Sequence, residues 1–178
     1  TQVSNLTYQN AAITSGAKDM LIRIATVYPV TGEGALTGVY ALLEKSGLTL
    51  DTKSVNVAQK EIKVINDLKD KSKMTDQQAN QVIGQIKQQV NQHIHVNQTI
   101  NDVDIVNIVN QTLVQNNLSI DVDMLNQLIV VIKEYSETDT AQDEEIVDQI
   151  DQSIMSGNWR NVLAALEGSY SSEELRNM

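Results

Sequence analysis

Three glycines ahead of a predicted helix are the part of this sequence with the clearest potential for chemistry. Gly32, Gly34 and Gly38 follow the chain's only proline, Pro29, in the run YPVTGEGALTGVY at residues 28–40. Backbone amides at the start of a helix can bind an anion, and glycines let a ligand approach them closely. The spacing GxGxxxG is one residue longer than the dinucleotide-binding motif, and the Gly-Lys-Ser/Thr of a P-loop is absent. The candidate ligand-binding residues of this loop are Thr31, Gly32, Glu33, Gly34, Thr37 and Gly38.

A purely structural role is the alternative for the same glycines. Tight turns and the close packing of a helix on its neighbours both favour glycine. Glu33 would also place a negative charge where an anion would have to bind. Under this interpretation, we expect Gly34 or Gly38 to adopt a conformation or a contact that no side chain allows.

The histidine and aspartate patterns favour structural roles over a metal site. His93 and His95 are two residues apart, so on a helix they point to different sides, and no HExxH motif is present. The motif Asp-Val-Asp occurs at residues 102–104 and 121–123, but neither copy has the glycine and the twelfth-position glutamate of a calcium loop. Acidic residues in the first turn of a helix complement its dipole. The sequence therefore predicts helix caps here, and no metal site, no cofactor and no catalytic residue.

The composition predicts a folded, acidic, aliphatic protein. The chain has 178 residues, 41% of them hydrophobic, with no Phe, no Cys and a formal net charge of −10. The charge is uneven, with 10 basic and 8 acidic residues in 1–96 but 3 basic and 15 acidic residues in 97–178. The net negative charge disfavours a nucleic-acid partner. The acidic second half is explained either by solvated helix faces or by a cationic partner. No apolar run is long enough for a membrane span, which needs about 18 residues.

The first 50 residues predict a small α/β portion. Residues 3–6 form a short strand candidate, Thr7 could cap a helix over residues 8–15, and Gly16 would end that helix. Residues 20–27 are apolar on both faces and predict a second strand, which completes a β-α-β unit. Two short strands bury too little to stand alone. We therefore expect the second strand to pair with residues upstream of this sequence or with a second copy in a homodimer.

The remainder predicts a multi-helix bundle, so the fold class is mainly α with a small α/β portion. A helix over residues 33–46 ends at Gly47, and further helices follow. The segment 122–135 is apolar nearly all round, which predicts the central and most buried helix. The predicted organisation is an α/β portion over 1–50, truncated at its N-terminus, a helical bundle over 51–137 and a helical hairpin over 143–178. The expected N-caps of the bundle are Asp51 or Thr52, Thr75 in a capping box with Gln78, Asn101 or Asp102, and Asp121.

Several motifs resemble one protein family. They are NLTY at residues 5–8, AA at 11–12, SGAKD at 15–19 and PVTGEGALTGVY at 29–40. Together they are similar to domain of unknown function family 1002, the YpuA-like secreted proteins of Gram-positive bacteria. The likeness continues more weakly to about residue 135 and does not reach the segment from 143 onward. The resemblance implies an exported protein with more sheet upstream, and it implies no activity, ligand or catalytic residue.

Two hypotheses of different class follow for the function. We favour a non-enzymatic extracellular or cell-envelope module whose helical surface binds a partner such as another envelope or extracellular protein. The alternative is a small-ligand or anion-binding protein, or a hydrolase, that uses the loop at residues 31–38.

Overall fold

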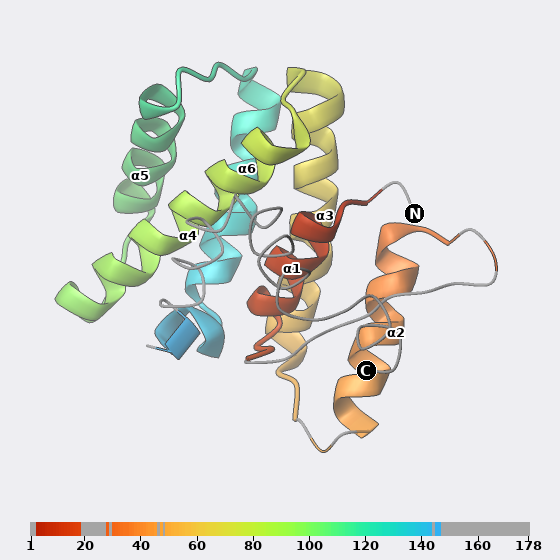
Figure 1. Ribbon diagram of the computed structural model, residues 1–178. Coiled ribbons are helices and arrows are strands. Elements are labelled where there is room, and N and C mark those ends of the chain that lie inside the picture. The colour runs from red at the N-terminus through yellow and green to blue at the C-terminus, as the bar shows by residue number, and fades with distance from the viewer. Residues whose placement is uncertain are drawn as a thin grey trace, which may run out of the picture.

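In the part of the chain that the structure describes, four helices form a bundle and two more pack against it (Figure 1). The computed structural model describes residues 3–18, 28, 30–45, 47, 49–143 and 145–146. Within these residues the elements are α1 (Asn5–Thr14), α2 (Gly32–Lys45), α3 (Thr52–Ser72), α4 (Asp76–Asn97), α5 (Asp102–Gln115), α6 (Val122–Ser136) and a short 3-10 helix, η1 (Asp139–Gln142).

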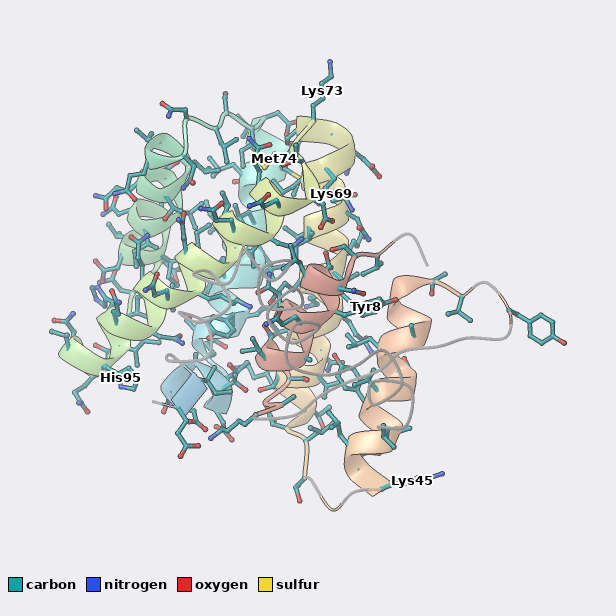
Figure 2. The ribbon with its side chains drawn as sticks, viewed as in Figure 1. Tyr8, Lys45, Lys69, Lys73, Met74 and His95 are labelled. Atoms are coloured by element: carbon teal, nitrogen blue, oxygen red, sulfur yellow. The ribbon has the colours of Figure 1, made fainter. Side chains whose placement is uncertain are left out.

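Helices α3 to α6 form the bundle, and successive members run in alternating directions (Figure 1). Among the described residues, its core consists almost entirely of Ile, Val, Leu, Ala and Met side chains, with Tyr135 as the one aromatic residue. Met74 lies in the turn between α3 and α4 and closes one end of this core (Figure 2). The core is therefore aliphatic, as the composition predicts.

Helix α4 is the central member of the fold, in place of the predicted segment 122–135. It packs against α1, α3, α5, α6 and η1. Helix α6 buries one face through residues such as Leu128 and Ile132 but exposes Val122 and Val130 to solvent. The prediction of a central α6 was wrong because a nearly continuous apolar sequence does not require that every face be covered.

A second, smaller core joins α1 and α2 to α3. Ala11 and Ala12 of α1, Leu36 and Val39 of α2, and Ile62 of α3 belong to it. Tyr8 lies between α1 and α2 and is buried there (Figure 2). Small alanines on α1 allow the helix to approach α3 closely, and α2 also packs on α3.

The N-caps of the bundle helices confirm the sequence analysis. The side chains of Asp51, Thr75, Asn101 and Asp121 each accept hydrogen bonds from amides in the first turns of α3, α4, α5 and α6. Thr75 forms the predicted capping box with Gln78. These interactions satisfy amides that no intrahelical carbonyl can reach, and they fix where each helix begins.

The predicted β-α-β unit was wrong. Residues 5 and 6, expected in the first strand, belong to α1, because Ser4 is the N-cap and its hydroxyl accepts a hydrogen bond from the Thr7 amide at 3.2 Å. Gly16 ends the helix as predicted, with φ at +93°. The second predicted strand, over residues 20–27, lies outside the described residues, as does most of the predicted hairpin over 143–178. The residues that the structure describes contain no strand, and the fold there is all α.

Residues after α6 turn back toward α1. Lys18, which follows α1, forms ion pairs with Asp143 at 2.5 Å and with Glu145 at 2.9 Å. The hydroxyl of Thr140 in η1 lies 3.1 Å from that of Ser54 in α3. These contacts, together with buried Ile146, hold the chain after α6 against the bundle.

Leu128 and Val130 provide a matched test of the two faces of α6. Leu128 is fully buried and Val130 is 53% exposed. We expect Leu128→Ala to lower the free energy of unfolding by about 2–5 kcal/mol, because it removes buried methyl groups and leaves a cavity. Val130→Ala should change it by less than about 0.5 kcal/mol. Urea denaturation followed by circular dichroism measures both, and equal losses would contradict the assigned orientation of α6.

The glycine that makes a contact too close for a side chain is Gly32, and not Gly34 or Gly38 as predicted. A Cβ atom at Gly32 would lie 2.3 Å from Val3 Cγ2 and 3.3 Å from Ile62 Cγ2, whereas one at Gly38 would meet nothing within 4 Å. At Gly34 the nearest atom would be the Thr31 hydroxyl at 3.3 Å. Gly32 is therefore the position at which α2 approaches the N-terminal segment and α3.

Alanine at two positions of α2 should have opposite effects. We expect Gly32→Ala to lower stability by about 1–3 kcal/mol through overpacking. Gly38→Ala should raise stability by about 0.5–1 kcal/mol, because alanine is the better helix former at an open position. Thermal denaturation of the two variants decides, and a destabilised Gly38→Ala protein beside an unaffected Gly32→Ala protein would refute the packing described.

Candidate functional site

The predicted glycine loop forms the N-terminal turn of α2. Thr31 is the N-cap, since its hydroxyl accepts a hydrogen bond from the Gly34 amide at 3.1 Å and its carbonyl accepts one from Ala35 at 3.0 Å. Gly32 is buried, whereas Gly34, Thr37 and Gly38 are exposed. The side chain of Glu33 lies outside the described part of the structure. The loop thus brings the candidate residues onto the first two turns of one helix, and ligand binding there stays a prediction.

A buried cluster of charged and polar side chains lies where α1 crosses α3 and α4. Glu61 of α3 and Lys87 of α4 form an ion pair, with 3.0 Å between Glu61 Oε1 and Lys87 Nζ. The Thr14 hydroxyl of α1 donates to Glu61 Oε2 at 2.5 Å and accepts from Lys87 Nζ at 3.0 Å. All three residues are at most 1% exposed. Three helices therefore meet at one buried salt bridge.

The polar contacts continue along α1. Lys87 Nζ also donates to the Asn10 carbonyl at 3.4 Å, and the Asn10 amide donates to Asn80 Oδ1 at 2.9 Å. Asn80 in turn donates to the Thr7 hydroxyl at 3.0 Å. Thr7, Asn10 and Thr14 are three and four residues apart, so they lie on one face of α1. This face, with Glu61, Asn80 and Lys87 opposite it, is called the polar seam below.

Aromatic residues border the seam on two sides. Lys87 Nζ lies 5.7 Å from the centre of the Tyr135 ring, a cation–π distance. The Tyr135 hydroxyl lies 3.0 Å from the Asn91 side-chain amide, in the orientation that satisfies both ends of the amide. Burial raises the pKa of Tyr135 and of Tyr40 in α2, and the negative charge of Glu61 raises the pKa of both further. Glu61 thus influences residues from α2 and α6 as well as α1 and α4.

The cluster has the components of a nucleophile–base pair but no access for a substrate. A hydroxyl within hydrogen-bond reach of an amine and a carboxylate is the arrangement that activates serine and threonine nucleophiles. Here the hydroxyl of Thr14 is fully buried, and so are both of its partners. The chemistry that this geometry supports is therefore electrostatic: it compensates two charges that would otherwise be costly to bury.

The sequence contained a signal for the polar seam, namely two charged residues at positions where the helix pattern predicts buried apolar ones. Glu61 falls between Ala58 and Ile65 in the buried stripe of α3, and Lys87 falls between Ile83 and Val90 in that of α4. Opposite charges at core positions of neighbouring helices indicate a buried pair. On α1 the buried residues include Thr7, Asn10 and Thr14 beside aliphatic ones, so its sequence also contained polar residues at inward positions.

His93 and several acidic residues outside the polar seam serve as caps and surface pairs. His93 Nε2 lies 3.3 Å from Asp104, and Asp102 pairs with Lys133 at 2.7 Å. Asp121 caps α6 by accepting from the Met124 amide at 2.7 Å. In the part of the chain that the structure describes, no three His, Asp or Glu side chains are grouped so that they could hold a metal ion. Among the described helices, none is long and apolar enough to cross a membrane.

A double-mutant cycle tests the ion pair. Lys87→Met leaves Glu61 buried without its charge partner, so we expect a loss of about 3–5 kcal/mol in the free energy of unfolding, and Glu61→Leu should cost a similar amount. The double variant should lose much less than the sum, because an apolar pair of similar volume fills the space without a charge. Chemical denaturation of the four proteins measures the coupling. Simple additivity would show that the two charges do not interact in the folded protein.

Comparison with known proteins gives one match. Neither a curated protein nor a solved structure matches the chain. The model of one family matches residues 1–153, which include α1 to α6 and the whole polar seam. The chain therefore belongs to the family described as protein of unknown function, DUF1002.

Proposed function

We propose that the protein is a non-enzymatic interaction module, exported to the cell envelope or the extracellular space, and that it binds a cationic partner segment through the outer face of α5 and α6. The resemblance to secreted Gram-positive proteins supports export. The observation that carries the binding surface is a set of valines exposed on this face. Each is between 53% and 74% exposed. They are Val103 and Val114 on α5, and Val122 and Val130 on α6, and we call them the valine face.

The helical periods place these valines opposite the core. On α5, the buried residues Ile105, Val109 and Thr112 share one side. Because a helix turns 100° per residue, Val103 and Val114 lie on the other side. On α6, Val122 and Val130 are eight residues apart, slightly more than two turns, and therefore share a stripe.

The ion pair between Asp102 and Lys133 sets the register of the two helices. Its 2.7 Å contact joins the start of α5 to the end of α6, which run in opposite directions (Figure 1). Residues near 103 therefore lie beside the turn that contains Val130, and Val114 lies beside the start of α6 and Val122. The four valines thus lie at two levels along the helical hairpin, one toward each of its ends.

The surrounding charge favours a cationic partner. Residues 102–143 hold eight acidic side chains and one basic side chain, Lys133. Lys133 is engaged by Asp102, whose hydrogen bond raises the pKa of the lysine. A second copy of the same face would bring like charges together, whereas a segment with apolar side chains flanked by Lys or Arg would complement both the valines and the charge.

A designed peptide tests this surface directly. The probe is an amphipathic helix of about 18 residues, five turns, with Leu on one face and Lys on the other, and its matched control has Glu in place of every Lys. We expect the Lys peptide to bind and the Glu peptide not to bind in fluorescence anisotropy. Val114→Ser with Val122→Ser should weaken binding at least tenfold, with a stability change of less than about 0.5 kcal/mol per site.

Leu42 supplies the control variant. It is 60% exposed on α2, away from the valine face, so Leu42→Ser should leave binding unchanged. An equal effect of Leu42→Ser, or binding that survives the double valine change, would show that the peptide binds elsewhere. Fractionation of cells that produce the protein natively tests export separately, and recovery of the protein in the cytoplasmic fraction alone would contradict that part of the proposal.

A further inference from the structure

Helix α1 meets the bundle through a polar surface that is unusual for a buried helix. Thr7, Asn10 and Thr14 face α3 and α4 across the polar seam, and each is at most 5% exposed. The principal apolar contacts of α1, through Ala11 and Ala12, belong to the smaller core that it shares with α2 and α3. The seam therefore joins α1 to α4 by hydrogen bonds, and apolar side chains join α1 to α3 in the smaller core, which contains Ala58 and Ile62 of α3.

The bundle's side of the seam is complete in charge without α1. Glu61 and Lys87 come from α3 and α4 and neutralise each other at 3.0 Å. Helix α1 adds two acceptors for Lys87, the Thr14 hydroxyl and the Asn10 carbonyl. Water can take the place of both acceptors, because an ammonium group hydrogen-bonds water readily. Exposing this surface is thus less unfavourable than exposing an apolar one of the same size.

The bundle also keeps its own hydrophobic core when α1 is left out. The larger core draws its side chains from α3 to α6 and from residues 141 and 146, and Ile13 is its only member from α1 among the described residues. Asn80 retains a hydrogen bond within α4, from its side-chain amide to the Asp76 carbonyl at 2.8 Å. Removal of α1 therefore takes one side chain from the larger core, and on the bundle it uncovers Ala58 and Ile62 of α3 beside the polar groups of the seam.

We propose that α1 is a reversible latch that leaves its place on α3 and α4 while the bundle stays folded. Undocking uncovers a polar surface between α3 and α4 that carries Glu61, Asn80 and Lys87. Docking restores one register only, because the Thr14 hydroxyl must reach both Glu61 and Lys87 while Asn10 reaches Asn80. Helix α1 thus has two states, docked and undocked. The ion pair stabilises the docked state through its hydrogen bonds to α1, and it lowers the cost of the undocked state because the exposed surface is polar.

Amide hydrogen exchange of the wild-type protein tests whether such an opening occurs. We expect the amides of Ala11, Ala12 and Ile13 to exchange at least tenfold faster than those of Ile86 and Val90 in α4. Their exchange should also depend less steeply on denaturant than that of α4, because undocking of α1 exposes less surface than unfolding of the bundle. Exchange of both groups at one rate, with one steep dependence on denaturant, would overturn the proposal.

Two variants separate a latch from simple fraying of a terminal helix. Thr14→Val removes the hydroxyl that joins α1 to the ion pair, so exchange in α1 should accelerate severalfold while exchange in α4 stays the same. Thr112→Val is the matched control, because Thr112 is another buried threonine, on α5, with its own hydrogen bonds to Gln89 and to the Ile108 carbonyl. It should leave the ratio of α1 to α4 exchange unchanged. A ratio that does not respond to Thr14→Val would mean that α1 only frays.

Replacing the ion pair tests whether Thr14 acts through it. In a Glu61→Leu/Lys87→Met protein the Thr14 hydroxyl has lost both partners across the seam, so adding Thr14→Val should no longer accelerate exchange in α1. An acceleration that persists in this background would show that Thr14 does not hold α1 through the ion pair, and would contradict the latch. If this variant does not fold, the wild-type and Thr14→Val measurements still decide between a latch and fraying.

Discussion

The buried ion pair between Glu61 and Lys87 is the constraint on which the arrangement of α1, α3 and α4 depends. Two charges in a protein interior are tolerated only when they meet each other and when their remaining hydrogen-bonding capacity is filled. Here Thr14 and Asn10 fill it from α1. An apolar contact would tolerate a shift of one helix along another, but these hydrogen bonds do not. The main effect of the ion pair is therefore to fix the position of α1 on α3 and α4, and its contribution to the stability of the fold is secondary.

Helix α4 connects this interior to the outer surface of the bundle. One side of it carries Lys87, and another side holds α5 through Gln89, which donates to Thr112 at 2.9 Å, and through Gln85, which accepts from Asn116 at 2.7 Å. The helix that positions the polar seam thus also positions the valine face. In the proposed function the charged interior serves as a scaffold, and recognition occurs at exposed apolar side chains.

Much of the bundle could be predicted from the sequence, because caps and aliphatic periodicity are local signals. Thr75 with Gln78 marks a helix start without any tertiary information. The first strand was misplaced because the helix that follows it begins earlier than expected: Ser4 is the N-cap and not Thr7, and both residue types can cap a helix. The close approach at Gly32 depends on Val3 and Ile62, which are distant in sequence. The partnership of Glu61 with Lys87 likewise exists only after α3 and α4 have packed.

Nuclear magnetic resonance of the lysine ammonium groups tests the central claim most directly. A hydrogen-bonded, buried ammonium exchanges its protons slowly with water, whereas an exposed one exchanges too fast to be observed near neutral pH. Lys73 projects into solvent beside the turn between α3 and α4 and is the internal reference (Figure 2). The structure predicts an observable Lys87 ammonium signal with cross-peaks to Thr14, and no signal from Lys73. A Lys87 ammonium that exchanges as fast as that of Lys73 would contradict the buried ion pair.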